Sequence, residues 1–263
     1  MITLESVGKV IKGNSVLEDI SFTINPKELV CITGPSGAGK STLLHLMIGA
    51  EQLTSGKIII DGVALNDLPP TVLQLFRRRV GVVFQDYKLL WNRTVYENVA
   101  FPLEVCGIPQ KLITNRVAAV LKDLGLQRKS NMMTSALSGG EKARTAIARA
   151  IVHNPMILLA DEPTGNLDPE QTSMILDLLQ LIQKHGTTVV LATHEVDIVD
   201  RLQTRVIRLE EGKVIRDSVG GYEDETTKSA AAAEAKEHKI FDKIPPASSS
   251  PGKNKIKIIS IHS

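Results

Sequence analysis

Residues 34–42, GPSGAGKST, contain glycines, a lysine and hydroxyl side chains at a spacing that can hold phosphate. The glycines allow successive backbone N–H groups to converge on phosphate oxygens. Lys40 can reach the β- and γ-phosphates, and the hydroxyl of Ser41 can ligate Mg²⁺. An apolar strand before the loop and a helix after it complete the context, and the helix dipole favours an anion. We therefore expect a nucleoside triphosphate, with Mg²⁺, to bind Gly34, Pro35, Ser36, Gly37, Ala38, Gly39, Lys40, Ser41 and Thr42.

The loop alone leaves kinases, GTPases and ATPases open, and residues 157–162, ILLADE, narrow the choice. Asp161 ends an apolar strand, where a carboxylate is costly to bury unless it holds something, here Mg²⁺ through water. Glu162 follows at once and could polarise an attacking water as a general base. The alternative for Glu162 is an acidic helix cap before Pro163.

Two further strands end in polar residues, Gln85 after VGVVF and His194 after TVVLAT. Ligands in open α/β sheets bind beyond the carboxyl ends of the strands, so these side chains should face the same crevice. Gln85 could ligate Mg²⁺ or orient the water, and His194 could donate to the γ-phosphate. The candidate catalytic residues are Glu162, His194 and Gln85, and the candidate metal ligands are Ser41, Gln85 and Asp161.

The segment LSGGE at residues 137–141 forms a second candidate anion cradle. The hydroxyl of Ser138 and the amides of Gly139 and Gly140 open a helix, with Glu141 in its first turn. Since the loop at 34–42 already surrounds a nucleotide, the second cradle makes sense if it serves ATP held by another copy of the chain. We therefore expect ATP to draw two chains into a head-to-tail homodimer with two-fold symmetry.

These side chains must be positioned by a sheet, and the chain supplies its strands. Apolar runs at residues 29–33, 80–84, 156–160 and 188–193 are typical of strands buried on both faces. Helical stretches separate them, which predicts an α/β fold with a parallel sheet and crossover helices.

Other segments predict antiparallel strands and two amphipathic helices. Apolar and polar residues alternate within residues 1–30, with Ile20, Phe22 and Ile24 on one face and a turn at 12–14. Two further hairpins should turn at Asp61-Gly62 and Glu211-Gly212. The predicted helices cover residues 110–126 and 141–152. Their expected buried stripes are Leu112, Val117, Val120, Leu121 and Leu124 in the first helix, and Ala143, Ala146, Ile147, Ala150 and Ile151 in the second.

Composition bounds the remaining possibilities. The chain has 263 residues and a formal net charge of +2, which gives no reason to expect nucleic-acid binding. Cys31 and Cys106 stand alone, without metal-ligand spacing. No apolar segment approaches the length of a membrane span and there is no signal peptide, so we expect a cytoplasmic protein. Residues 222–263 should form a disordered tail, whose lysines and isoleucines could instead touch anionic lipid or a partner.

The set GPSGAGKST, FQD, LSGGE, LLADEPTGNLD and ATH resembles the ATP-binding cassette (ABC) ATPases in order and spacing over about residues 1–220. The resemblance implies a P-loop NTPase with a RecA-like parallel sheet, an N-terminal antiparallel β subdomain and an α-helical signature subdomain at about 86–154, together forming an ATP-binding domain at 1–221. It also implies that Asn166, Leu167 and Asp168 link the two sites of the dimer, and that the Gln85 segment and the helices after it receive a membrane partner.

Within that family, residues 84–105 are most similar to the FtsE group of cell-division ATPases. This implies an integral membrane partner resembling FtsX, a place at the cytoplasmic face of the membrane held mainly through that partner, and control of cell-wall hydrolysis by dimer closure. The alternatives are the ATPase of an exporter or lipoprotein-release system and a soluble ABC ATPase acting on nucleic acid. A P-loop phosphotransferase is weaker, since it would not need LSGGE.

Position 11 and the two residues after LSGGE depart from the usual pattern of the family. The family usually places an aromatic residue near position 11 to stack on adenine, whereas this chain has Ile11, which implies apolar contact without stacking. The residues after LSGGE are Lys142 and Ala143 in place of the common glutamines. Trp91 is the only tryptophan, and it is either an exposed anchor for a partner or a residue partly buried among the helices.

Overall fold

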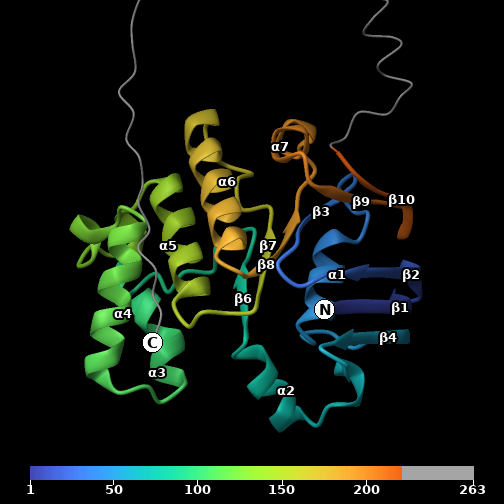
Figure 1. The fold of residues 1–263 in the computed structure, drawn as a ribbon, viewed down its shortest axis with the longest axis horizontal. Helices are drawn as coiled ribbons and strands as arrows, with labels where there is room; N and C mark the ends of the chain where they lie inside the picture. Colours follow the sequence, from blue (N-terminus) through green and yellow to red (C-terminus); the bar gives the residue numbers. More distant parts are fainter. Residues whose placement is uncertain (221–263) are drawn as a thin grey trace, which may run out of the picture. The chain divides into compact units, whose positions relative to one another are not determined.

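The computed structural model describes residues 1–220, which contain two sheets and the helices around them (Figure 1). The larger sheet has the order β10-β9-β3-β8-β7-β6, with β3, β6, β7, β8 and β9 parallel and β10 antiparallel to β9. Its strands are β3 (Leu29–Thr33), β6 (Val80–Val83), β7 (Ile157–Asp161), β8 (Thr188–Ala192), β9 (Arg205–Glu210) and β10 (Lys213–Val219). The predicted α/β fold with a parallel sheet is confirmed.

The parallel strands are buried because helices cover both faces of the sheet. Every residue of β3, β7 and β8 is buried, as the continuous apolar runs predict. The crossover helices are α1 (Lys40–Met47), α2 (Pro70–Arg77), α3 (Val95–Val105), α4 (Gln110–Asp123), α5 (Gly139–Ile151), α6 (Pro169–Lys184) and α7 (Val196–Leu202), and short 3₁₀ helices are η1 (Leu65–Asp67), η2 (Gln127–Lys129) and η3 (Thr134–Ala136).

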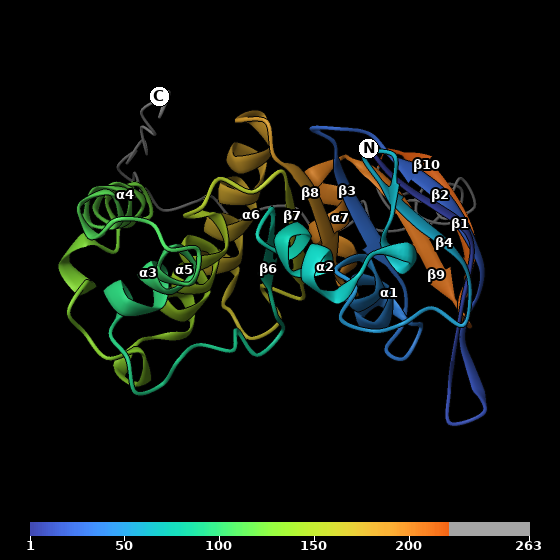
Figure 2. The same cartoon turned by 90° about the horizontal axis from the view of Figure 1, so that it is seen from below.

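The smaller sheet is antiparallel and has the order β2-β1-β4-β5. It consists of β1 (Ile2–Ile11), β2 (Asn14–Ile24), β4 (Ser55–Ile60) and β5 (Val63–Ala64). Lys12 and Gly13 at the first turn, and Asp61 and Gly62 at the next, have positive φ, as two-residue hairpin turns require. Figure 2 shows this sheet beside β9 and β10, on the side of the parallel sheet away from α5.

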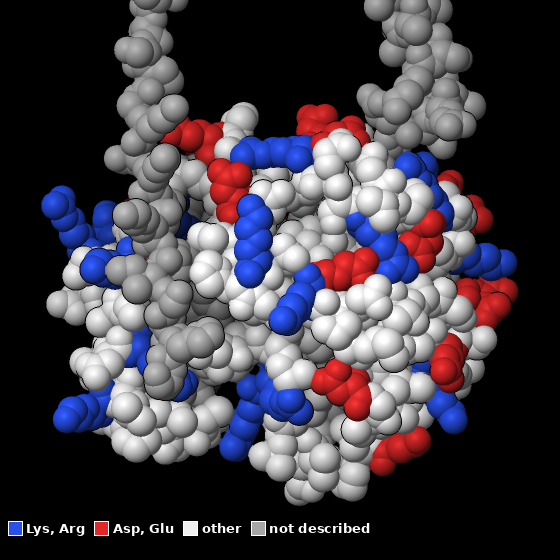
Figure 3. Space-filling model, viewed as in Figure 1, with Lys and Arg blue, Asp and Glu red and all other residues white. Residues whose placement is uncertain are grey.

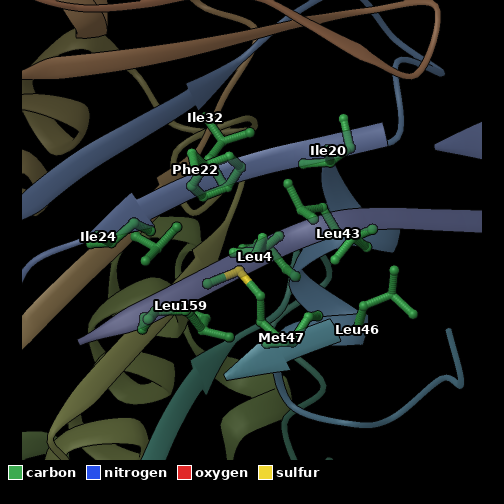
Figure 4. Packing of buried hydrophobic residues seen from close by; sticks show 14 of the residues in the cluster. Leu4, Ile20, Phe22, Ile24, Ile32, Leu43, Leu46, Met47 and Leu159 are labelled. Atoms are coloured by element: carbon green, nitrogen blue, oxygen red, sulfur yellow. The ribbon is translucent and has the colours of Figure 1, made fainter. Parts of the chain in front are cut away.

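The core joins both sheets around helix α1 (Figure 4). Ile20, Phe22 and Ile24 of β2 point into it, as their alternation predicts. They meet Leu43 of α1, which begins directly after the glycine-rich loop. Burying one such side chain contributes about 1.5–3 kcal/mol, so this packing fixes the base of the loop. The fully buried members shown there include Leu4, Ile20, Ile24, Ile32, Leu43, Leu46, Met47 and Leu159.

The last described hairpin is tied back to the first. The N–H of Glu18 in β2 donates to the carbonyl of Gly212 in the β9–β10 turn at 2.8 Å. Arg205 donates to the carbonyl of Thr23 at 2.6 Å and forms a two-bond pair with Asp217 at 2.6 and 2.7 Å. The two sheets are therefore held together by a backbone hydrogen bond and by the side chain of Arg205, as well as by the apolar core.

Some details differ from the sequence-based expectations. Leu112, expected on the buried stripe of its helix, is 50% exposed, whereas its neighbour Ile113 is buried and continues the stripe of Val117, Val120 and Leu121 at helical spacing. That helix ends at Asp123, and Gly125 follows with a positive φ that terminates it. The expected tail at 222–263 lies outside the described residues. No helix within residues 1–220 is both long and apolar enough to cross a membrane.

Candidate functional site

The glycine-rich loop lies between β3 and α1, where its φ angles suit glycine. Gly37 and Gly39 have φ of 82° and 98°, and a Cβ on Gly39 would lie 2.6 Å from the side chain of Leu17. Lys40 is buried, and its ammonium donates to the carbonyls of Gly34 and Pro35 at 2.8 and 3.0 Å. Burial lowers the pKa of Lys40, while Glu162 and Asp161 oppose that shift. The loop therefore holds a positive charge at its centre.

Three strand-end residues converge beside this loop. One oxygen of the Glu162 carboxylate lies 2.9 Å from Nδ1 of His194 and 4.0 Å from Nζ of Lys40. Its other oxygen accepts from the amide of Gln85 at 3.4 Å. Glu162 has a left-handed φ of 43°, and its N–H donates to the carbonyl of Ala192 on β8. The structure thus brings together the candidate catalytic residues, which come from three separate strands.

The helix-cap alternative for Glu162 is wrong, because the chain turns after Pro163 and the next helix, α6, begins at Pro169. Asp168 instead caps that helix, accepting from the N–H of Gln171 at 2.8 Å. The carboxylate of Glu162 therefore has no role in closing a helix end, and it remains available to a water molecule.

Asp161 provides the test of whether a divalent cation fits. It is buried and one of its carboxylate oxygens, Oδ1, has no hydrogen-bond partner, whereas Ser41 donates to the carboxylate. Burial raises the pKa of Asp161. A buried, unpaired carboxylate oxygen beside a hydroxyl suits Mg²⁺, which is commonly bound through one or two carboxylates and completes its shell with phosphate and water. Within residues 1–220, no group of three or more His, Cys, Asp or Glu side chains could hold a metal without the nucleotide.

A cavity of about 670 Å³ opens between the loop and the β1–β2 hairpin. Ile11 lines one end of it and Gln85, Glu162 and His194 the other. Lys12 and Asn14, at the tip of the hairpin, also line the cavity and were not expected from the sequence. The turn at 12–14 predicted the hairpin, but nothing in the pattern indicated that its tip would face the loop.

The second cradle is a helix N-terminus with a complete capping box. Ser138 is the N-cap of α5, and its hydroxyl oxygen accepts from the N–H of Glu141 while the Glu141 carboxylate accepts from the N–H of Ser138 at 2.9 Å. The side chain of Ser138 also hydrogen-bonds the Glu141 carboxylate. The backbone N–H of Ser138 lowers the pKa of Glu141, and Lys129, 3.1 Å away, adds to the shift.

The glycines of this cradle pack against the segment that follows Glu162. A Cβ on Gly139 would lie 3.2 Å from the side chain of Leu167, and one on Gly140 would lie 2.0 Å from the amide of Gln171. Arg144 holds that amide by donating to it at 2.9 Å. Asn166, whose carbonyl lies 3.7 Å from the Gly139 Cβ position, belongs to the same contact. The expected link between the two sites is therefore in contact with the second cradle.

The two cradles lie apart in one chain. Among the described residues, the lining of the nucleotide cavity includes none of residues 138–140. Helices α1 and α5, which begin at the two cradles, lie on opposite sides of strands β6–β8 in both views (Figures 1 and 2). A single nucleotide in the cavity of one chain is consequently out of reach of the second cradle of that chain.

A second cavity, of about 540 Å³, lies between the parallel sheet and the helices α3 and α5. We call it the groove, and the residues that line it include Arg78, Val80, Lys88, Phe101, Val105 and Arg149. Its lining includes three arginines and one lysine but no Asp or Glu. Trp91 lies outside the lining and is 52% exposed, and its role as an anchor for a partner stays a prediction. The ammonium of Lys142 lies 5.2 Å from the centre of its ring.

Comparisons with known proteins agree with this geometry. A model of the ABC transporter family matches residues 17–165. The cell division ATP-binding protein FtsE of Mycobacterium tuberculosis is 47% identical over 223 residues, which cover 84% of this chain and 97% of the relative. The methionine import ATP-binding protein MetN 2 of Bacillus licheniformis is 41% identical over 222 residues, covering 82% and 65%. A dimeric post-hydrolysis structure of the ATP-binding cassette MJ0796, bound to ADP and Pi, superimposes with a TM-score of 0.77 at 35% identity, covering 83% of this chain and 98% of that one.

Proposed function

The chain belongs to the ABC transporter family of ATPases and is similar to FtsE over nearly the whole length of that protein, and we propose that it is the ATP-hydrolysing subunit of a membrane complex of the FtsE–FtsX kind, acting in cell division. The FtsE relatives match over nearly their whole length, whereas this chain covers about two thirds of the methionine importer. That difference favours cell division over import. The exporter and lipoprotein-release reading shares the same catalytic core and remains the alternative.

Residues 1–221 form the ATP-binding domain in this proposal, with a helical subdomain at about 86–154. Lys40 and the loop N–H groups hold the phosphates, and Ile11 contacts the base. Ser41, Asp161 and Gln85 hold Mg²⁺, which neutralises phosphate charge when bound. The second cradle, residues 138–140, belongs to the ATP of a second copy.

Hydrolysis follows from the position of Glu162. Its carboxylate accepts a proton from water while the water oxygen bonds to the γ-phosphorus and the bond from that phosphorus to the bridging oxygen of ADP breaks. His194 orients the carboxylate through its 2.9 Å contact and stands at the rim, where it can donate to the γ-phosphate. Lys40 stabilises the charge that develops on the transferred oxygens.

The groove supports a membrane partner beside the Gln85 segment. Phe84 and Lys88 from that segment line it together with Phe101 and Val105 of α3. An apolar floor with four cationic side chains around it suits a short partner helix that carries carboxylates. Association with the cytoplasmic face of the membrane would then run through the partner. The face seen in Figure 3 has acidic and basic side chains interspersed, which does not favour the nucleic-acid alternative.

The separation of the two cradles is the observation that carries the proposal, because it leaves each chain with half of a reaction centre. We expect Glu162→Gln to keep ATP binding, to lose turnover by at least about a hundredfold, and to accumulate an ATP-bound dimer. Phosphate release and light scattering measure these two effects. Glu210→Gln is the matched control, since Glu210 lies on β9 and pairs with Arg208. Wild-type turnover in Glu162→Gln would remove the base from the mechanism.

A further inference from the structure

Tyr87 is a residue that neither the motifs nor the mechanism above uses, although it touches the catalytic segment. Its hydroxyl donates to the carbonyl of Pro163 at 3.2 Å, directly after the general base Glu162. The side chain is half-buried, and burial raises the pKa of Tyr87, so its hydroxyl keeps the proton that it donates. We propose that Tyr87 is a positioning residue for Glu162, held in place by Arg149. This inference rests on the proposed role of Glu162 in hydrolysis.

Glu162 needs such a restraint because its backbone is strained. A non-glycine residue at φ 43° is uncommon, and a following proline further restricts the residue before it. Strain of this kind persists only where the surroundings enforce it. On one side of Glu162 the enforcing contact is its own N–H to the carbonyl of Ala192. On the other side it is the bond from Tyr87 to Pro163.

Arg149 holds Tyr87 in turn. Tyr87 and Lys88 are consecutive residues with left-handed φ angles of 59° and 43°. The guanidinium of Arg149 donates to the carbonyls of both, at 2.6 and 2.7 Å. Arg149 is half-buried, and a guanidinium can make two such bonds in one plane whereas an ammonium cannot. Arg149 therefore holds the strained turn after Gln85 in addition to the backbone hydrogen bonds of that turn.

The position of Arg149 links the groove to the contact between Arg149 and Tyr87. Arg149 stands on α5, the helix that begins at the second cradle, and both Arg149 and Lys88 line the groove. An element seated in the groove therefore meets Arg149, which holds Tyr87, and Lys88, whose carbonyl Arg149 also binds. A movement of Arg149 would therefore be transmitted through the side chain of Tyr87 to the carbonyl of Pro163. In this way an element bound in the groove would control the position of Glu162.

The test compares Tyr87→Phe with the wild-type full-length chain, using Mg·ATP as substrate and a fluorescent ATP analogue for affinity. Phenylalanine keeps the ring and removes only the hydroxyl. We expect kcat to fall by about 3- to 10-fold, the effect of one hydrogen bond, while KM, analogue affinity and melting temperature stay unchanged. Tyr96→Phe is the control, because the hydroxyl of Tyr96 contacts Thr114 in the helical region, away from Glu162.

Three outcomes would overturn the inference: a wild-type kcat in Tyr87→Phe, a loss seen only in KM, or an equal loss in Tyr96→Phe. Arg149→Lys should lower kcat as Tyr87→Phe does, and the double variant should be no slower than the slower single variant, because Arg149 acts through Tyr87. If the fold losses in kcat of the two single variants multiplied in the double variant, Arg149 would not act through Tyr87. Glu162→Gln distinguishes failure of this inference from failure of the proposed function. If Glu162→Gln lacks turnover while Tyr87→Phe has the wild-type kcat, the role of Glu162 stands and only the role of Tyr87 is wrong.

Discussion

At the scale of single residues, environment determines the chemistry of carboxylates that look alike in the sequence. Asp161 is buried with one unpaired oxygen, Glu162 is held by Gln85 and His194, and Glu141 closes a capping box. Burial raises the pKa of Asp161, whereas hydrogen bonding to the N–H of Ser138 lowers that of Glu141. These carboxylates therefore differ in role because of their partners and their depth.

The pH dependence of stability should reveal the capping box. The pKa of Glu141 in the folded chain is below its ordinary value of 4.5, so its stabilising effect is complete above that value and is lost as the pH falls through the lowered pKa. We expect Glu141→Gln to lower the free energy of unfolding at pH 7 by less than about 1 kcal/mol, since solvent screens the carboxylate. In urea denaturation, the gap to wild type should narrow below pH 4.5. A gap that stays constant with pH would assign the loss to packing.

At the scale of elements, the sequence predicted most of the site because the site sits on strand ends. Asp161, Gln85 and His194 each follow an apolar run, and parallel strands bring their carboxyl ends to one edge of the sheet. The loop at 34–42 was predicted for the same reason, since its glycines lie between a strand and a helix. The apolar runs that predicted the strands therefore also located the candidate catalytic residues at the strand ends.

What the sequence could not predict depends on contacts between distant segments. Tyr87 and Arg149 are 62 residues apart and meet only because Gly81 lets α5 approach β6, where a Cβ would lie 2.2 Å from the carbonyl of Ala150. That contact is not contained in the local pattern of charged and apolar residues.

The groove should discriminate by charge. We expect Arg78→Glu to reduce recovery of the membrane partner at least about fivefold in a pull-down from membranes, because it places a carboxylate opposite those of the partner helix. Recovery is measured by peptide identification of the captured protein. Lys111→Glu makes the same charge change on α4, outside the groove lining, and should leave recovery as in wild type. Equal losses in both variants would indicate attraction by overall charge instead of a seat in the groove.

At the scale of the whole molecule, the separation of the cradles makes two copies the working unit. Each reaction centre takes Lys40 from one chain and Ser138 from the other in the proposed dimer. Helices α1 and α5 stand on opposite sides of the parallel strands, so a head-to-tail arrangement lets each reach its counterpart (Figure 1). ATP then acts as a contact between subunits, and its hydrolysis weakens that contact.

Mixing defective chains tests this arrangement directly. Lys40→Ala and Ser138→Arg should each be inactive alone, but mixed chains should regain activity, because their heterodimer has one site with an intact Lys40 and an intact Ser138. With random pairing, about a quarter of all sites are restored. Phosphate release is the measurement, and the control is Lys40→Ala mixed with the Lys40→Ala/Ser138→Arg double variant, because no dimer in that mixture has an intact site. Failure of the two single variants to complement would contradict shared sites.

The bond from Arg205 to the carbonyl of Thr23 has a consequence for how this protein is made. Its two partners are 182 residues apart, and it fastens the last described hairpin to the second strand. At about 5–20 residues per second, a ribosome needs about 10–40 s to deliver the second partner after the first. During that interval the early antiparallel strands lack the contact between β2 and the β9–β10 hairpin. Nascent chains should therefore be most exposed to chaperones and proteases until the hairpin at 205–219 leaves the exit tunnel.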